Sequence, residues 1–262
     1  MLKVTNLSKK FLEGTNNEVV ALKGIDFSMN RGDFLTVIGS NGAGKTTFLN
    51  LIAGSLFPST GRVEIAGEDV TNYSEHERAA YIGRVFQEPG KGTAPGMTVA
   101  QNLSLALKKS NRGLRKGVTP KRKELFYEEL SKLGLGLEER LDEKVRHLSG
   151  GQRQGVAVLM STLTTPKLLL LDEHTASLDP KNASKIIEIT RKLVKEKELT
   201  TIMVTHDMKQ ALDLGNRLTM LHRGEVIYDV NGERKKELTI DDLLESFSER
   251  KIEDDELLLS ME

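Results

Sequence analysis

The residues whose types and spacing most clearly indicate a chemical function are nine consecutive positions, Gly39–Thr47, with the sequence GSNGAGKTT. An apolar run, Phe34–Ile38, precedes them and a helix-compatible run, Phe48–Ala53, follows, so the context is strand, glycine-rich turn and helix. Glycines let successive backbone N–H groups point at a phosphate chain, and the helix N-terminus adds positive potential. Lys45 would then reach the β- and γ-phosphates, while the Thr46 hydroxyl would hold Mg²⁺. The expected phosphate contacts are Gly39, Ser40, Asn41, Gly42, Ala43, Gly44, Lys45, Thr46 and Thr47.

An ordinary glycine-rich turn between a strand and a helix is the alternative interpretation, and the flanking runs make it the weaker one. This motif alone indicates only a nucleoside triphosphate, since kinases, GTPases and transport ATPases share it. A second potential anion cradle follows in the stretch Leu148–Gln152, with the sequence LSGGQ. Ser149 is placed to cap a helix, and Gly150 and Gly151 allow close backbone approach. A simple capped turn would explain this stretch by itself, but it would not predict the residues that follow.

Acidic residues stand directly after a buried strand, since Asp172 and Glu173 follow four consecutive leucines, Leu168–Leu171. Such a run is typical of a parallel strand covered on both faces, and ligands bind at the carboxyl end of these strands. Asp172 is the candidate Mg²⁺ carboxylate, acting through a bound water. Glu173 is the candidate base that polarises the attacking water.

Two further polar side chains are expected at the same edge of the sheet. Gln87 follows the apolar run Ile82–Phe86 and precedes a connector rich in glycine and proline, so it could bind Mg²⁺ or position water. His206 follows the apolar run Thr200–Thr205, where a γ-phosphate could be sensed. A solvated glutamine and a structural histidine are the ordinary alternatives for these two residues.

The elements that must position these groups follow from the apolar periodicity. Strands are expected at 2–7, 19–29 and 34–38, with hairpins at 61–67 and 217–230; Pro180 begins a helix that runs to about Lys197. Residues 99–141 are helical in pattern and contain a basic run, interpreted as solvated loop or as contact with anionic lipid. The basic residues are Lys108, Lys109, Arg112, Arg115, Lys116, Lys121, Arg122 and Lys123. The fold class is therefore α/β, with an antiparallel layer on a nucleotide-binding core and a helical insert.

Composition sets limits on the function. The 262 residues carry 38 Lys plus Arg against 38 Asp plus Glu, and this balance gives no indication of a nucleic-acid partner. The absence of cysteine excludes disulfides and thiolate metal sites. No uncharged run has the length and apolarity of a membrane helix or a secretion signal, so we expect another chain to span the membrane if the protein acts there.

With these motifs in one order, the sequence resembles the nucleotide-binding subunit of an ABC transporter over essentially its whole length. The resemblance rests on GSNGAGKTT, Gln87, LSGGQ, the leucine run ending in Asp172, Glu173, Asp179 and His206. It implies a RecA-like α/β core with an antiparallel layer at 1–88 and 165–235, a helical subdomain at 97–164 and an acidic tail at 236–262. It also implies that ATP and Mg²⁺ bind between the phosphate loop of one copy and the LSGGQ signature of another, which makes a homodimer. The signature contacts are then Ser149, Gly150, Gly151 and Gln152.

Two more roles come from the resemblance alone. Phe11 falls where the family places an aromatic residue that stacks on adenine, whereas sequence context by itself leaves stacking and a core or loop role equally open. Asp179 falls in the family's D-loop. Two departures stand out: His174 replaces the usual proline after the catalytic glutamate, and Gly155 replaces a common arginine after LSGGQRQ. Neither position contacts phosphate in the family, so we expect hydrolysis to survive.

Several longer stretches are similar to the ATPase subunits of bacterial importers assigned to tryptophan and tyrosine, namely YIGRVFQEPGKGTAPGMT, LLLLDEHTASLDP and MVTHDMKQALDLGNRL. The resemblance implies a peripheral ATPase on the cytoplasmic face of the membrane. Its expected partners are transmembrane permease subunits, a second copy of itself and an extracytoplasmic substrate-binding lipoprotein. An exporter subunit and a soluble ATP-dependent switch are the alternatives. The single phosphate loop, the single signature and the absence of a long heptad array make the soluble switch the weaker of the two.

Overall fold

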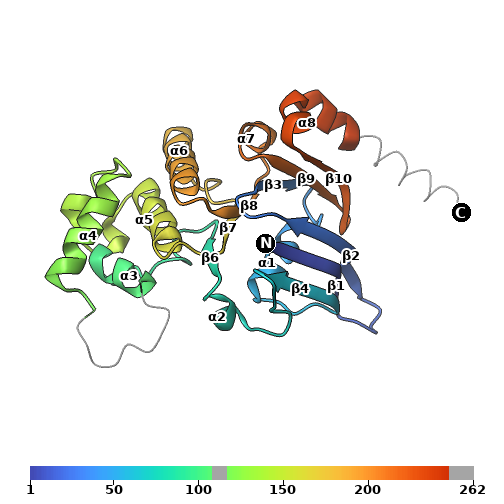
Figure 1. Ribbon diagram of the computed structural model, residues 1–262, viewed down its shortest axis with the longest axis horizontal. Coiled ribbons are helices and arrows are strands. Elements are labelled where there is room, and N and C mark those ends of the chain that lie inside the picture. Colours follow the sequence, from blue (N-terminus) through green and yellow to red (C-terminus); the bar gives the residue numbers. More distant parts are fainter. Residues whose placement is uncertain (108–116, 248–262) are drawn as a thin grey trace, which may run out of the picture.

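The computed structural model describes residues 1–107 and 117–247, and Figure 1 shows their arrangement. The strands of the described part are β1 Leu2–Phe11, β2 Val19–Met29, β3 Phe34–Gly39, β4 Thr60–Ile65, β5 Glu68–Asp69, β6 Ile82–Val85, β7 Leu168–Asp172, β8 Thr200–Val204, β9 Arg217–His222 and β10 Glu225–Asn231. The α-helices are α1 Lys45–Ala53, α2 Glu75–Arg78, α3 Val99–Ala106, α4 Pro120–Ser131, α5 Gly150–Thr162, α6 Pro180–Glu196, α7 Met208–Asp213 and α8 Gly232–Glu237. Two 3₁₀ turns, Glu138–Arg140 and Val145–His147, precede α5.

The central sheet has the strand order β10-β9-β3-β8-β7-β6. All neighbouring pairs are parallel except β9 and β10, which form the hairpin expected around Arg223 and Gly224. Strands β3, β7 and β8 are buried along almost their whole length, because their apolar runs face helices on both sides. Val204 pairs with both Val37 and Asp172, so the carboxyl ends of these three strands are level. The residues that follow them therefore share one edge of the sheet.

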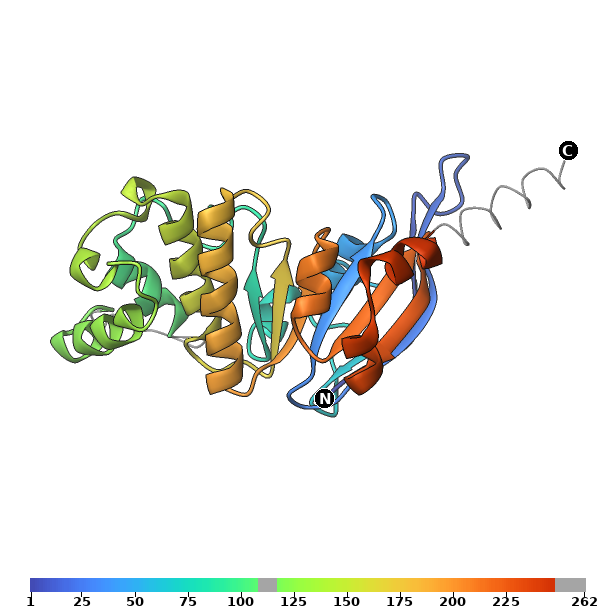
Figure 2. The ribbon, with the colours of Figure 1, turned by 90° about the horizontal axis from the view of Figure 1, so that it is seen from above.

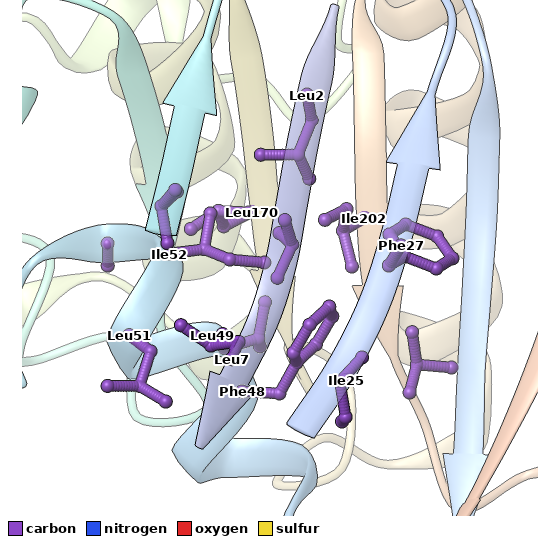
Figure 3. Packing of buried hydrophobic residues seen from close by; sticks show 14 of the residues in the cluster. Leu2, Leu7, Ile25, Phe27, Phe48, Leu49, Leu51, Ile52, Leu170 and Ile202 are labelled. Carbon is purple, nitrogen blue, oxygen red and sulfur yellow. The ribbon is translucent and has the colours of Figure 1, made fainter. Parts of the chain in front are cut away.

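A smaller antiparallel sheet, ordered β2-β1-β4-β5, covers helix α1 on the side away from the central sheet. Figure 3 shows how apolar side chains from the three layers meet: Leu2, Leu7, Ile25 and Phe27 from the small sheet, Phe48, Leu49 and Ile52 from α1, and Leu170 and Ile202 from the central sheet. Phe27 and Phe48 pack edge to face, with ring centroids 5.9 Å apart. Helix α1 is thus held on both sides, which fixes the loop that precedes it.

Helices α3, α4, α5 and α6 lie together on the opposite side of the molecule (Figures 1 and 2). They share a second apolar core with the other face of the central sheet, formed by Leu103, Phe126, Leu130, Val156, Leu159, Leu169, Leu171, Ile186 and Ile189. Thr119 caps α4, which has proline at its first position, as the Thr119-Pro120 pair predicts. The predicted α/β class, with an antiparallel layer and a helical insert, is confirmed.

Three details differ from the sequence-based expectations. Strand β1 continues to Phe11 instead of ending at Leu7, because its hairpin with β2 extends to the pair Phe11 and Val19. Lys121, Arg122 and Lys123 lie on α4 and not in a loop. The other members of the basic run, Lys108, Lys109, Arg112, Arg115 and Lys116, lie outside the described residues.

The segment after β10 is part of the fold as far as it is described. Helix α8 spans the boundary expected at residue 236, and residues 240–247 are also helical. Val230 and Leu243 are buried in a third apolar cluster beneath β9 and α7. The acidic tail beyond residue 247 lies outside the described residues. Across residues 1–107 and 117–247, no helix is long and apolar enough to cross a bilayer.

Candidate functional site

The loop between β3 and α1 has a backbone that glycine alone fits at two positions. Gly39 has φ 156°, and a Cβ there would lie 2.2 Å from the Leu221 carbonyl oxygen. Gly44 has φ 100°, and a Cβ there would lie 2.7 Å from the Ala21 carbonyl oxygen. The tight turn directs the start of α1 toward the edge of the sheet, while Ser40, Asn41 and Gly42 stay exposed and Ala43 packs inward. Thr46 and Thr47, in the first turn of α1, are exposed and half-buried.

Lys45 lies across the mouth of this loop. Its Nζ donates hydrogen bonds to the carbonyl oxygens of Gly39 at 2.7 Å and Ser40 at 3.0 Å. Burial lowers the pKa of Lys45, and the negative charges of Glu173 and Asp172 oppose that shift. The ammonium group therefore sits where an anionic ligand would stabilise it, between the loop and the two carboxylates.

The carboxylates lie at the end of β7, as predicted from the leucine run. Glu173 has φ 43°, in the left-handed region, and its N–H donates to the Val204 carbonyl oxygen at 3.0 Å. Its Oε2 lies 3.6 Å from Nδ1 of His206, whose side chain is 64% exposed. Both line a cavity of about 150 Å³, together with His174, Thr205 and Gln210. The structure thus places the candidate base and the candidate sensor side by side.

The residues whose oxygen atoms are expected to bind a metal lie at the same edge of the central sheet. They are the Asp172 carboxylate, the Thr46 hydroxyl and the Gln87 side-chain amide, a set that suits Mg²⁺. Burial raises the pKa of Asp172, while Arg84, 3.4 Å away, opposes that shift. Gln87 is exposed, and its backbone carbonyl oxygen accepts a hydrogen bond from Ser177 at 3.3 Å.

The LSGGQ stretch begins helix α5 and is held by reciprocal hydrogen bonds. Ser149 Oγ accepts from the Gln152 backbone N–H at 3.3 Å, and Gln152 Oε1 accepts from the Ser149 N–H at 3.2 Å. Arg140 also donates to Gln152 Oε1 at 2.8 Å. A Cβ on Gly151 would lie 2.8 Å from Asn182, and one on Gly150 would lie 3.4 Å from Leu178. This cradle is therefore built against α6 and the loop before it.

The remaining predicted residues occupy separate places. Asp179 caps α6, accepting from the Asn182 N–H at 3.1 Å and from its side-chain amide at 2.6 Å, which lowers the pKa of Asp179. Phe11 stands at the end of β1 with 36% of its surface exposed, and Lys9 Nζ lies 5.4 Å from its ring centre. Part of the Phe11 ring is therefore open to solvent.

The two departures from the family pattern are accommodated by packing. His174 is fully buried, its Nε2 lies 3.2 Å from Thr190 Oγ1, and burial lowers its pKa to about 4, so it is neutral at physiological pH. Thr190 Oγ donates to Ile186, so the histidine supplies the proton of their shared bond. At Gly155, a Cβ would lie 2.4 Å from Leu135 Cδ1, so a leucine fills the space beside the glycine.

Sequence reasoning missed three polar residues that connect these parts. Arg84 contacts Asp172, Arg140 contacts Gln152, and Gln154, fully buried on α5, donates to the Phe86 carbonyl oxygen at 3.3 Å. A charge in the middle of the apolar run around Arg84 was a usable signal, because buried charges need partners. Nothing in the local sequence marked the other two.

A glycine-rich phosphate loop, a lysine at its mouth and a level row of acidic and polar side chains define a P-loop nucleoside triphosphatase. Comparison with known proteins agrees with this class. The model of the ABC transporter family matches residues 22–176. The tyrosine transport ATP-binding protein of Clostridioides difficile is 46% identical over 248 residues, which cover 94% of this chain and 98% of that protein.

Two solved structures are similar in fold. The dimeric post-hydrolysis state of the ATP-binding cassette MJ0796, bound to ADP and Pi, has a TM-score of 0.75 at 31% identity, over 88% of this chain and 98% of that one. CbiO1 from Clostridium perfringens, part of the ABC transporter complex cbiONQ, has a TM-score of 0.72 at 31% identity, over 88% of both chains. The chain therefore belongs to the ABC transporter family, as its ATP-binding, ATP-hydrolysing subunit.

Proposed function

We propose that this subunit closes as a homodimer on two ATP molecules and thereby drives a membrane permease that imports an aromatic amino acid. The observation that carries the dimer is the separation of the two anion cradles within one chain. The phosphate loop is built against Leu221, Ala21 and the start of β2, whereas the signature is built against Leu178 and Asn182. Because the glycines of the two cradles pack against different elements, a second copy is the natural source of the signature for each nucleotide.

The chemistry follows from the order of the side chains along the edge of the sheet. Lys45 would exchange its bonds to the Gly39 and Ser40 carbonyls for phosphate oxygens. Glu173 would accept the proton of the attacking water, and His206, 3.6 Å away, would contact the γ-phosphate. The left-handed backbone at Glu173 directs its side chain toward the cavity that it shares with His206.

Mg²⁺ fits the donors present, and Thr46, Gln87 and Asp172 are the residues that would hold it. When bound, it would neutralise charge on the phosphates. Gln87 lies exposed just after β6, so its carboxamide would be the oxygen donor that this strand supplies to the site.

The substrate class is supported by the relative named for tyrosine transport, which aligns over nearly its whole length. We assign the chain to the cytoplasmic face of the membrane, bound to permease subunits, with a substrate-binding lipoprotein on the other side. An exporter subunit is the second candidate, since the site geometry is independent of the direction of transport.

Substitution of Glu173 by Gln tests hydrolysis and dimerisation together. The variant keeps the shape of the side chain but cannot accept the proton, so we expect turnover to fall at least about a hundredfold. Binding of a fluorescent ATP analogue should be unchanged, and size-exclusion chromatography in ATP should show a dimer. Turnover close to that of the wild type would contradict the assignment of Glu173 as the base.

Affinity purification of the tagged chain from its native membranes, in mild detergent, tests the transport role. Import predicts a polytopic permease and a binding lipoprotein in the same complex, and the lipoprotein should bind tyrosine or tryptophan in a calorimetric titration. A permease without any binding protein would favour export. Recovery with ribosomes alone would contradict transport.

A further inference from the structure

Arg84 is a charged residue in the middle of strand β6, and only 11% of its side chain is exposed. Its guanidinium group donates to Asn50 Oδ1 at 2.6 Å and to Ser55 Oγ at 3.0 Å. The same group reaches Asp172 Oδ2 at 3.4 Å. Arg84 therefore joins helix α1, which follows the phosphate loop, to the carboxylate at the end of β7.

The position of Arg84 in the strand is one where packing alone would favour an apolar residue. Ile82 and Arg84 point toward α1, and Ile82 belongs to the apolar core around that helix. Val85, on the other face, belongs to the core of the helical side. A buried guanidinium is costly unless it is paired and hydrogen-bonded. Both terminal nitrogens of Arg84 have partners through the contacts above, and its guanidinium carbon lies 4.6 Å from the centre of the Phe86 ring. Its buried Nε has no hydrogen-bond partner among the residues that the structure describes, so the position carries a cost that packing alone does not explain.

We infer that Arg84 is a positioning residue for the metal-binding edge of the ATP site. It binds one carboxylate oxygen of Asp172, Oδ2, which leaves Oδ1 for the site. Through Asn50 and Ser55 it also sets the separation between Asp172 and helix α1, whose first turn carries Thr46. Arg84 thus fixes two of the proposed Mg²⁺ contacts relative to each other, an assignment that rests on the metal site given under the proposed function.

A purely structural role for Arg84 makes a different prediction from a positioning role. If Arg84 only held β6 against α1, its replacement would destabilise the fold. It would then change the nucleotide affinity by the same factor with and without a divalent cation. A positioning residue affects the part of the affinity that Mg²⁺ adds. Residues that orient metal ligands typically change metal affinity by about 10- to 100-fold when they are replaced.

The experiment measures the affinity of the full-length chain for a fluorescent ATP analogue, in Mg²⁺ and in EDTA. In the Arg84→Met variant we expect the ratio of the two affinities to fall about tenfold or more, with the affinity in EDTA nearly unchanged. Arg84→Lys keeps the charge but loses the paired contacts, so it should lie between Met and the wild type. Combined with Asp172→Asn, the Arg84→Met change should have almost no further effect on the ratio.

Glu75→Gln is the matched control. Glu75 is an exposed partner of the same guanidinium, 3.8 Å away. Its carboxylate accepts a hydrogen bond from Ser55 Oγ at 2.6 Å, which the glutamine oxygen can still accept, so the ratio should keep its wild-type value. Equal losses in Mg²⁺ and EDTA for both Arg84 variants, or full additivity with Asp172→Asn, would overturn the inference. If Mg²⁺ adds nothing to the affinity of the wild type, the proposed metal site itself is wrong, which separates that failure from a failure of Arg84.

Discussion

Glu173 has a left-handed backbone that is held by a hydrogen bond to the neighbouring strand. Its φ of 43° is unfavourable for a residue with a Cβ, and its backbone N–H is bound to the neighbouring strand. Strain of this kind persists where the surrounding structure holds the residue in place. Here β7 and β8 fix the backbone, so the carboxylate is presented to the cavity rather than to the sheet.

The His206 side chain is more exposed than that of Glu173, and this exposure determines the expected effect of replacing it. Because its side chain is largely exposed and its described contact with a charged group is the one to Glu173, His206→Ala should leave folding and ATP affinity nearly intact. We expect kcat to fall at least about a hundredfold, as for loss of a group that acts in the transition state. Steady-state kinetics with a parallel nucleotide-binding titration will show this. An unchanged kcat would exclude a catalytic role for His206.

For individual residues, the sequence predicted where a side chain lies in the fold better than it predicted which other side chains it contacts. The phosphate loop, the acids after the leucine run and His206 were found because chain order and strand ends place them at one edge of a parallel sheet. Arg84, Arg140 and Gln154 were missed because each acts on a residue distant in sequence. Their pairing depends on how the layers pack, which local patterns do not encode.

Among the elements, helix α1 depends on a buried arginine at its far end. The Arg78 guanidinium group donates to the carbonyl oxygens of Leu51, Ile52, Thr71 and Tyr73. Two of these belong to the last turn of α1, so Arg78 satisfies carbonyl groups that the helix itself leaves free. Burial lowers its pKa to about 10, which still leaves it charged at physiological pH.

Replacing Arg78 by Met should therefore destabilise the protein. The apolar side chain fills part of the space but removes the donor from two buried carbonyl oxygens, those of Leu51 and Ile52, and from the part-buried ones of Thr71 and Tyr73. We expect the free energy of unfolding to fall by about 3 kcal/mol. Urea denaturation measures it, and the exposed Arg62→Met variant, with an ion pair at the surface, serves as the control with little effect. Equal stability of the two variants would contradict the capping role.

Helix α8 is attached by Lys235, which is 3% exposed. Its Nζ donates to the Leu214 carbonyl oxygen and approaches Thr36 Oγ1 and the Gly215 carbonyl oxygen, each at 3.4 Å. Burial lowers its pKa from 10.5 to about 8, and Asp213 opposes that shift. The lysine thus joins α8 to β3 and to the end of α7.

This pKa shift predicts a dependence of stability on pH. Between about pH 8 and 10.5 the unfolded chain holds a proton at Lys235 that the folded chain has released, so the free energy of unfolding should rise with pH in that window. Below pH 8 both states are protonated and the contribution is flat. Urea denaturation of the wild type and of Lys235→Met, at several pH values, isolates the effect. A rise of the same size in both would show that other groups cause it.

Element boundaries were predicted well where glycine, proline or a capping residue marks them, as at Thr119, Ser149 and Pro180. They were predicted poorly where tertiary contact extends an element. Strand β1 continues because β2 pairs with it, and α8 packs through a lysine that local polarity assigns to the surface. Both outcomes reflect contacts between segments distant in the chain.

For the molecule as a whole, the separation of the two cradles can be tested by mixing defective chains. Lys45→Ala removes the cation of the phosphate loop, and Ser149→Arg blocks the signature, so each variant alone should lack ATPase activity. In mixed dimers one of the two sites combines an intact loop with an intact signature. We expect activity to appear on mixing the purified variants, measured by phosphate release. Two chains that stay inactive together would contradict shared sites.

The separation of the phosphate loop from the signature also determines how defective copies would behave in a cell. In the proposed dimer a chain with an altered phosphate loop still pairs with a normal chain. The site formed by that altered loop and the normal chain's signature cannot hydrolyse ATP. Normal chains are thereby withdrawn into impaired complexes in proportion to the abundance of the defective chain. Because each mixed dimer keeps one complete site, made of the normal loop and the altered chain's intact signature, a Lys45 variant is expected to lower the turnover of each complex without abolishing it.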